Sequence, residues 1–421
     1  MAAKPVRRSF NRLAVCVVLL MCLLSLYEYQ FPDPGPRQNA AQIAKHTNMG
    51  MTEQQCRAAF PGLTMEVDAL VERGPFRLER ANDDYMGLVQ GRIADGKLYI
   101  TSYDHKPNRD MLFERTATLQ ALHRAIITTP FTEPLPDTIF ALTVLDTPRN
   151  NTWSFSRSNN PLLSAERYWV MPHFSSWSWP LPFIGTADEA LAKIDVIEEM
   201  GWEQKIDKTV WRGTAWFNNV GNTDLRPKLL KVTKGKEWAD VEQLVWGSNA
   251  VTANNSLSIE VFCRYKYMIY TEGITYSGRL PFHQACASIL LIPPINYLMH
   301  TTHSIRPVLA SSLLNPFSPP VHDSRWPTTY SASEGNAIFV DDDWKDIEAT
   351  VMWLREHPAV AEGIARRQRK TFVESGVLSM EAEVCYWRAL IRAWSSVAVL
   401  GEGWDGAEGV RWETFALGVR E

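Results

Sequence analysis

The sequence lacks several features that would place it in a common class. It has no basic excess, because 43 Lys and Arg residues are balanced by 47 Asp and Glu residues, which gives a net charge of −4. Proteins that bind nucleic acid in bulk usually carry such an excess, so no nucleic-acid partner is expected. None of the cysteines beyond residue 27 has a C-x-x-C partner, which argues against a zinc site.

Charge is also missing from one run near the amino terminus, residues 13–27, which follows Lys4, Arg7, Arg8 and Arg12. A basic flank before an apolar run favours an amino terminus in the cytosol. The run is short for a spanning helix and also fits the hydrophobic region of a signal peptide. Because no small-residue cleavage site follows it, we expect an uncleaved transmembrane signal-anchor over 13–27 and a cytoplasmic tail over 1–12. Such a single-pass type II membrane protein would have its catalytic part in the lumen of the secretory pathway, and a short span suits the thinner early-secretory membranes.

Cysteine and sequon usage agrees with a lumenal location. Cys56, Cys263, Cys286 and Cys385 lie beyond the apolar run, and four cysteines in an oxidising lumen can form two disulfides in three possible pairings. Asn150 and Asn254 each begin an N-x-[S/T] glycosylation sequon. The carboxyl-terminal residues 418–421 do not form a KDEL-type retrieval signal, so the Golgi membrane is favoured over the endoplasmic reticulum.

The first half of the chain reads as a linker followed by a domain. Turn formers at 32–36 predict a stem over residues 28–55. A first domain is expected over 56–200, with strands at 97–103 and 139–145. A helix is expected at 187–200, where Thr186 and Glu189 have the spacing of a capping box and Gly201 ends the helix.

Residues 201–375 alternate strand and helix patterns, which predicts a second domain. Strands are expected at 209–211, 267–271, 288–292 and 337–340, and helices at 224–232, near 278, at 344–356 and at 359–373. This alternation predicts an α/β fold with a parallel sheet, whose strands bind ligands at their carboxyl ends. A closing segment over 376–400 contains a helix expected at 379–399, with Val384, Trp387, Ile391 and Trp394 at helical spacing. The segment 295–335 reads as a long irregular loop, and residues 401–421 as a mobile tail.

The strand–turn–helix unit at 267–279 is the most informative stretch for chemistry. Ser277 is placed to cap the helix, Gly278 lets the backbone approach a ligand, and Arg279 supplies a fixed positive charge. A helix amino terminus beside an arginine suits a diphosphate, although the same residues also fit a purely structural turn. The run 211–214 (Trp-Arg-Gly-Thr) and Arg226 add cationic and hydroxyl donors in the same half.

Taken together, these elements resemble glycosyltransferase family 90. The residues that carry the resemblance are Trp211-Arg212-Gly213, Arg226, Arg264-Tyr265-Lys266-Tyr267, Ser277-Gly278-Arg279, Ala365-Arg366-Arg367 and Cys385-Tyr386-Trp387. The family includes fungal capsule-associated xylosyltransferases and animal protein O-glucosyltransferases. The resemblance covers roughly residues 130 to 400 and is strongest from 209 to 290.

The resemblance implies a fold and a mechanism. Members have two Rossmann-like domains that face a cleft, the GT-B arrangement, and they are inverting and metal-independent. Their catalytic base is an Asp at the end of a strand after a Leu-Pro-Asp turn. Here Leu135-Pro136-Asp137 leads to Asp146, which is therefore the expected base, although an Asp before Pro148 also fits a turn or a cap. An inverting transfer needs one carboxylate as base and positive charge on the departing diphosphate.

The same resemblance assigns the remaining sites. The donor contacts would be Arg212, Gly213, Thr214, Arg226, Ile274, Tyr276, Ser277, Gly278 and Arg279. Phe174, Trp177 and Trp179 would lie on the acceptor side of the cleft, where core packing is the alternative. The family's disulfides would correspond to Cys263–Cys286 and Cys56–Cys385. The expected partners are a UDP-sugar, either UDP-xylose or UDP-glucose, and a glycan or protein hydroxyl, with no metal or other cofactor.

Two rival functions stay open from the sequence. Asp341-Asp342-Asp343 matches the D-x-D pattern of metal-dependent glycosyltransferases, although acidic residues before a helix also satisfy its first amides. A secretory glycan-binding protein that lost catalysis would keep the same fold. His300 and His303 have the spacing of two metal ligands but lack a nearby third, and residues 366–370 read as a solvated basic helix face. The segment 306–335 lacks the Trp-x-His-Tyr element that members often carry, with only His322 and Trp326 nearby, so the sequence does not identify the sugar.

Overall fold

The computed structural model describes residues 48–81, 85–163, 165–218, 221–248, 252–317, 326, 328–404 and 408–418. The expected cytoplasmic tail, the signal-anchor at 13–27, most of the stem and His322 lie outside the described residues. Among the helices that the structure describes, none is long and apolar enough to cross a membrane. Residues Met49–Glu421 form one compact unit, which is the part considered below.

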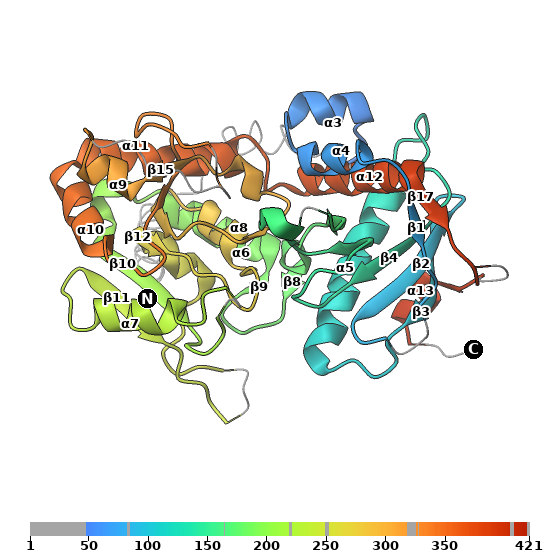
Figure 1. Cartoon of the computed structure of the whole chain (residues 1–421), viewed down its shortest axis with the longest axis horizontal. Helices are drawn as coiled ribbons and strands as arrows, with labels where there is room; N and C mark the ends of the chain where they lie inside the picture. Colours follow the sequence, from blue (N-terminus) through green and yellow to red (C-terminus); the bar gives the residue numbers. More distant parts are fainter. Residues whose placement is uncertain are drawn as a thin grey trace, which may run out of the picture. The chain divides into compact units, whose positions relative to one another are not determined.

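This unit is built on two six-stranded sheets with helices around them (Figure 1). The first sheet has the order β18 (Val410–Arg411), β3 (Lys97–Tyr103), β2 (Leu88–Ala94), β4 (Thr138–Thr143), β5 (Thr152–Ser154), β7 (Tyr168–Val170). Its β18, β3, β2 and β4 pair antiparallel, whereas β4, β5 and β7 pair parallel. This mixed sheet differs from the parallel sheet of a Rossmann-like domain, because β2 and β3 pair antiparallel as a hairpin.

The second sheet is parallel throughout and matches the expected βα alternation. Its order is β11 (Ala239–Gln243), β10 (Ile206–Gly213), β12 (Tyr265–Ile269), β13 (Ile289–Ile292), β16 (Ala337–Phe339), β15 (Pro307–Leu309). The chain runs from β10 to β11 on one side and then to β12 on the other. A topological switch point therefore lies between the carboxyl ends of β10 and β12.

Apolar side chains cover both faces of this parallel sheet. On β12, Tyr267 and Ile269 belong to one buried cluster and Met268 to the other. The first cluster also contains side chains of α7 (Leu225–Thr233), α9 (Ala310–Leu314), α10 (Ile347–Glu356) and α11 (Pro358–Arg369). The second contains side chains of α6 (Ala187–Glu198), the 3₁₀ turn η4 (Ile259–Arg264) and α8 (Leu280–Gln284). Strands buried on both faces are typical of parallel α/β sheets.

The last long helix returns to the first sheet. After α11 and a π-helical turn at Lys370–Glu374, α12 (Met380–Val397) contacts α3 (Glu53–Ala59), α4 (Met65–Val71), α5 (Arg109–Ile127) and β4 (Figure 1). Val384, Trp387, Ile391 and Trp394 are all buried, which confirms the pattern read from the sequence. Ser379 caps the helix by accepting a hydrogen bond from the Ala382 amide.

Short elements complete the unit. Three two-stranded pairs join β1 (Phe76–Leu78) to β17 (Ala398–Leu400), β6 (Arg157–Ser158) to β14 (Tyr297–Leu298), and β8 (Ser178–Trp179) to β9 (Gly185–Thr186). Further single turns are η1 (Pro161–Leu163), η2 (Phe174–Ser176), η3 (Trp202–Gln204) and η5 (Thr302–Ser304). Both disulfides implied by the family resemblance are formed, Cys56–Cys385 between α3 and α12 and Cys263–Cys286 between η4 and the residue two past α8.

Four local expectations differ from the structure. Thr186 precedes α6, but its side chain makes no capping hydrogen bond. The loop expected over 295–335 contains strand β15 and helix α9. Pro307 can begin β15 because this strand lies at a sheet edge. The boundary expected at 200 separates α6 from the second sheet, whereas α6 contacts η4, which leads into β12. Residues 408–418 are no mobile tail, because β18 pairs with β3 and α13 (Trp412–Ala416) contains the buried Trp412.

Candidate active site

The expected base lies just beyond the carboxyl end of β4. β4 ends at Thr143, and Asp146 follows three residues later. The Tyr276 hydroxyl lies 3.4 Å from Asp146 Oδ1, and the Thr275 hydroxyl donates to the Asp146 carbonyl at 2.8 Å. The fold therefore brings Asp146 from the first sheet to the loop that follows β12 of the second.

The Asp146 carboxyl group is exposed and has a raised pKa. Its side chain is open to solvent, yet the protein atoms around it desolvate the carboxylate and raise its pKa, and the Tyr276 hydroxyl opposes this shift. A base with a raised pKa accepts a proton more readily, provided that it is still ionised at the working pH. The side chain caps no helix, and residue 146 lies in a bend that precedes Pro148.

A second carboxyl group, which the sequence did not indicate, lies close enough to Asp146 for the two charges to interact. Glu114 lies on α5, and its pKa is raised to about 8 by burial first, then by the charges of Asp146 and Asp110. The Tyr276 phenol interacts electrostatically with both Asp146 and Glu114. No local motif marks Glu114, because its neighbour Asp146 comes from a distant part of the sequence.

Two arginines meet at the switch point of the second sheet. Arg226 of α7 is buried and donates from Nε to the Thr271 hydroxyl and to the Glu272 carbonyl, both at 3.1 Å, and from Nη1 to the Thr214 carbonyl at 2.8 Å. It therefore links the carboxyl ends of β10 and β12. Arg279 lies close enough for its charge to act on Arg226, and it donates to the Arg212 carbonyl.

These two guanidinium groups create a local excess of positive charge. Burial and then the Arg279 charge lower the pKa of Arg226 to about 9, and burial lowers the pKa of Arg279 to about 10. Both remain cationic at pH 7. In the described part of the chain, no carboxylate forms an ion pair with either group. Two adjacent cations without a counter-charge provide a site suited to a polyanion such as a diphosphate.

Other expected donor residues have structural roles in this arrangement. The Arg212 guanidinium donates to Asp240 Oδ1 at 2.7 Å and to the Asp240 carbonyl at 2.8 Å, so it ties β10 to β11. The Thr214 hydroxyl accepts from the Trp246 indole at 2.9 Å. Added side-chain atoms at Gly213 would collide with the Trp211 ring, which explains the glycine by packing.

The 274–279 loop also differs in detail from the structure that the sequence predicts for it. α8 begins only at Leu280 and Ser277 does not cap it; instead the Ser277 amide donates to the Tyr270 hydroxyl at 3.0 Å. At Gly278, a Cβ would lie 2.4 Å from His173 and 2.9 Å from Trp179, so protein packing, and not ligand approach, requires this glycine. Ile274 is exposed at the start of the loop.

The aromatic residues expected on the acceptor side divide into two groups. Phe174 is buried, with its ring edge-on to Phe155 and Trp179 at centroid distances of 5.5 and 5.4 Å. Trp179 is half-buried beside Gly278, whereas Trp177 is 39% exposed. Trp177 is therefore the member of this group whose ring is open for stacking on a sugar.

The acidic run at 341–343 follows β16, and its Asp342 lines a small pocket with Tyr270 and Glu272, the residue whose carbonyl accepts from Arg226. It lines a pocket of about 770 Å³ that includes Lys228 and Lys345 but none of Asp146, Arg226 and Arg279. Lys345 Nζ lies 3.1 Å from Asp341 and 3.9 Å from Asp343, so both carboxylates already have a cationic partner. The carboxylates that line this pocket are therefore paired with a lysine and are separate from the contacts made by Asp146.

Residues considered as metal ligands do not converge in the described ranges. The one close group of three His, Cys or acidic side chains found there is Glu198 with Cys263 and Cys286, whose sulfur atoms are bonded to each other. His300 is buried and His303 half-buried, and burial lowers the pKa of both. They are thus neutral side chains of the interior at pH 7.

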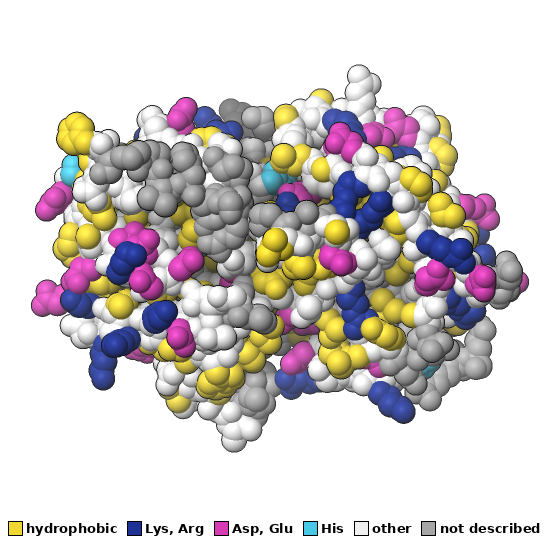
Figure 2. Space-filling model, in the orientation of Figure 1, with side chains coloured by type: hydrophobic (Ala, Val, Ile, Leu, Met, Phe, Trp, Pro, Cys, Tyr) yellow, Lys and Arg dark blue, Asp and Glu magenta, His cyan; other side chains and the backbone are white. Residues whose placement is uncertain are grey.

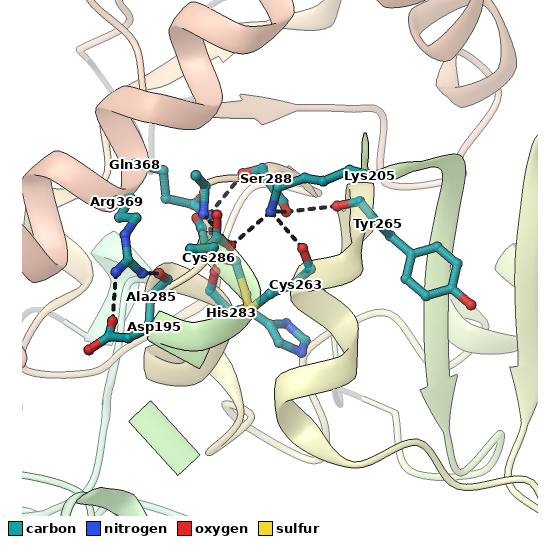
Figure 3. A network of polar contacts seen from close by, with 12 residues as sticks. Asp195, Lys205, Cys263, Tyr265, His283, Ala285, Cys286, Ser288, Gln368 and Arg369 are labelled. Atoms are coloured by element: carbon teal, nitrogen blue, oxygen red, sulfur yellow. Dashed lines mark hydrogen bonds and ion pairs between the residues drawn. A yellow bond between two sulfur atoms is a disulfide. The ribbon is translucent and has the colours of Figure 1, made fainter. Parts of the chain in front are cut away.

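A network of polar contacts fixes the segment that carries Arg279 (Figure 3). Gln368 Nε2 donates to the carbonyls of His283, Cys286 and Ser288, each at 3.0 Å. From another side, Lys205 Nζ reaches the Cys263 carbonyl at 2.5 Å. Together with the Cys263–Cys286 disulfide, these bonds hold α8 against η4 and the start of β13.

The structure is that of an α/β protein with two buried arginines at the carboxyl edge of a parallel sheet, where such folds bind ligands, and with Asp146 contacting the neighbouring loop. A family model for glycosyl transferase family 90 matches residues 53–310, and the chain belongs to that family. It is therefore a glycosyltransferase. A search of curated proteins found no match.

Proposed function

We propose that this glycosyltransferase moves xylose or glucose from a UDP-sugar to a hydroxyl of a glycan or protein, with inversion and without a metal. The observation that carries the proposal is the loop at 275–279. Its first two residues contact Asp146, and its last, Arg279, lies beside Arg226. One loop thus connects a candidate base to a candidate diphosphate site.

In the proposed reaction, the Asp146 carboxylate accepts the proton of the acceptor hydroxyl while that oxygen bonds to the anomeric carbon. The bond from this carbon to the diphosphate oxygen breaks, and its electron pair leaves on UDP. Arg226 and Arg279 would stabilise the charge that develops on the departing diphosphate, which is the task of a metal in other transferases. The parallel second sheet, with the β12–α8 loop contacting the end of β4, supports the nucleotide-binding half of a GT-B-like arrangement, whereas the first sheet is mixed.

The proposal also includes where the protein is located and how it is anchored. We propose a single-pass Golgi membrane protein anchored through residues 13–27, with a lumenal catalytic part. The two disulfides support an oxidising compartment. Asn150 and Asn254 are exposed, as glycosylation requires, and the mixed acidic and basic side chains on the face in Figure 2 agree with a partner other than nucleic acid.

The decisive test is a donor screen on the purified full-length chain, which follows UDP release with mixed glycan and peptide acceptors, with and without EDTA. We expect release from UDP-xylose or UDP-glucose that survives EDTA. The Asp146→Asn variant should lose roughly 100-fold or more of the rate, the usual contribution of a positioned base. Asp341→Asn and Asp343→Asn serve as matched controls and should retain activity.

Other outcomes would redirect the assignment. Loss of activity with EDTA and in the Asp341→Asn and Asp343→Asn variants would place the chemistry at the 341–343 pocket. Binding of UDP without turnover of any donor, unchanged in Asp146→Asn, would indicate a glycan-binding protein. A product with retained anomeric configuration in an NMR assay would exclude the inverting mechanism.

A further inference from the structure

Two consecutive side chains of the β12–α8 loop make the polar contacts of Asp146. The Thr275 hydroxyl donates to its backbone carbonyl at 2.8 Å, and the Tyr276 hydroxyl lies 3.4 Å from its carboxylate. Thr275 and Tyr276 are both buried, at 2% and 7% exposure. Hydroxyl groups that are buried in this way lose free energy unless they find an acceptor, and Asp146 supplies one to each.

The loop that carries these hydroxyls has a fixed shape. The Gly273 amide donates to the Tyr276 carbonyl at 3.1 Å, which closes a tight turn, and the Ser277 amide bonds to the Tyr270 hydroxyl. The Tyr276 ring lies edge-on to Phe155 and His173, at centroid distances of 6.2 and 5.1 Å. Its hydroxyl is thus directed by ring packing, independently of its contact with Asp146.

Asp146, in contrast, is held by few contacts with residues near it in the sequence. It follows the end of β4 and belongs to no strand or helix. In the described residues its hydrogen bonds are with Thr275 and Tyr276, which approach from the other sheet. The orientation of the carboxylate therefore depends on the β12–α8 loop.

The same loop is joined to the arginine pair. Arg226 donates to the Glu272 carbonyl at the loop's beginning, and Arg279 ends it. A diphosphate bound by these arginines would therefore be linked, through Arg226 and Arg279, to the loop that orients the carboxylate. Within the described residues, no other segment forms hydrogen bonds with both Asp146 and the arginine pair.

We propose that Thr275 and Tyr276 are positioning residues for the catalytic base, and that through them the donor-binding loop orients Asp146 for proton transfer. The inference rests on the proposed function, because it takes Asp146 as the base. Thr275 fixes the backbone at residue 146, and Tyr276 fixes the carboxylate and bonds to its ionised form. The two contacts therefore have separable effects on the reaction.

The test uses the full-length chain with the donor found in the screen, and it compares Tyr276→Phe, Thr275→Val and Thr275→Ser. In the first two variants kcat should fall roughly 10- to 100-fold, as expected for a misplaced catalytic group, while the KM for the donor stays within about twofold. Thr275→Ser keeps the hydroxyl and should retain the wild-type rate. This rescue distinguishes loss of the hydrogen bond from loss of the fold.

The dependence of kcat on pH separates the two contacts further. The hydroxyl of Tyr276 lowers the pKa of Asp146, so Tyr276→Phe should move the acidic limb of the profile to higher pH. Thr275→Val should lower kcat without moving that limb, because Thr275 bonds the backbone carbonyl only. The matched control is Tyr386→Phe on α12, which removes a buried hydroxyl bonded to the Val170 carbonyl and should leave kcat and the profile unchanged.

The outcomes keep this inference distinct from the proposed function. If Asp146→Asn is inactive while Tyr276→Phe and Thr275→Val show wild-type kcat and pH profiles, the positioning role is overturned and the base assignment stands. If Asp146→Asn remains fully active, the base assignment itself fails. A fall in thermal stability with normal kcat in the folded fraction would assign both hydroxyls a structural role only, which also contradicts the inference.

Discussion

Glu114 is held in a folded environment that favours its neutral form. Burial contributes most to the raised pKa of about 8, followed by the charges of Asp146 and Asp110. In an unfolded chain the pKa of a glutamate is near 4.3. Between this pH and about 8, the folded chain therefore holds a proton on Glu114 that the unfolded chain has lost. A perturbed carboxyl beside a candidate base is common at functional sites, where it is retained at a cost in stability.

This difference predicts how stability depends on pH. Between about pH 4.5 and 8 the unfolded chain has lost the Glu114 proton while the folded chain keeps it, so stability falls as pH rises, by up to about 1.4 kcal/mol per pH unit. Glu114→Gln removes this contribution. Urea unfolding at pH 5, 6.5 and 8 should show the variant gaining stability over the wild type as pH rises. Glu402→Gln, at an exposed glutamate, is the control; equal slopes for wild type and Glu114→Gln would contradict the prediction.

At the level of single residues, the sequence predicted what short motifs and the family pattern encode. Asp146 and the pair of Arg226 and Arg279 lie in one region, and both disulfides are formed. The ion pair of Arg212 with Asp240 was not predicted, because Asp240 lies on the neighbouring strand and only the sheet order reveals this pairing. Glu114 was missed for the same reason, since its environment is made by residues far away in the chain.

At the level of elements, periodic patterns predicted which strands and helices exist better than they predicted the residues at which these begin and end. β3 coincides with its expected range, because its alternation of buried and accessible side chains is regular. β10 is longer than expected, since the strand continues through the polar residues Asp207 and Lys208 at its start. β15 was missed because Pro307 reads as a breaker, although an edge strand tolerates it. Residues 1–47 lie outside the described ranges, so the anchor stays a prediction.

A buried ion pair joins three elements beside the donor loop. Lys205 Nζ lies 2.8 Å from Glu198 Oε1 at the end of α6, with side-chain exposures of 1% and 6%. Lys205 also donates to the Cys263 carbonyl and to the Ser288 hydroxyl (Figure 3). Glu198 accepts from the Ala287 amide at 3.0 Å. The pair thus connects α6, η4 and the segment before β13.

Removing one member of this pair should destabilise the fold strongly. Lys205→Met leaves the Glu198 carboxylate buried without its cation, which typically costs about 3–5 kcal/mol, whereas Lys205→Met with Glu198→Gln should cost less. Lys236→Met is the matched control, because its partner Glu348 is about half exposed and such pairs contribute about 1 kcal/mol or less. Urea unfolding measures all three, and equal losses for Lys205→Met and Lys236→Met would refute the argument.

At the scale of the whole unit, distant parts of the sequence complete the first sheet and its helices. Cys56–Cys385 joins α3 to α12, and β17 pairs with β1. Beyond β17, Trp404 donates to the Leu78 carbonyl at 3.0 Å. The amino-terminal and carboxyl-terminal segments of the described unit are therefore both part of one folded structure, and the first sheet is incomplete without the end of the chain.

The last described segment, 408–418, provides a test of this dependence. β18 extends the first sheet beyond β3, and Trp412 is buried. The centroid of the Phe415 ring lies 4.8 Å from that of Tyr103 and 5.3 Å from the Arg115 guanidinium. Arg115 belongs to α5 beside Glu114, so the segment supports the helix that borders the candidate site.

Deleting residues 408–421 should therefore lower the free energy of unfolding by roughly 3 kcal/mol or more, the usual cost of losing one large buried aromatic side chain. Trp412→Ala in the full-length chain should reproduce most of that loss, because it removes the buried indole and leaves β18 in place. Leu417→Ala is the control, since Leu417 is 79% exposed and its truncation should change stability by about 0.5 kcal/mol at most.

Thermal and urea unfolding of the three variants measure the effect. If the deletion and Trp412→Ala both unfold with the wild-type midpoint, residues 408–418 contribute nothing to the fold and act only as a tail; if they unfold early and Leu417→Ala does not, the carboxyl terminus is a structural part of the sheet beside the candidate site.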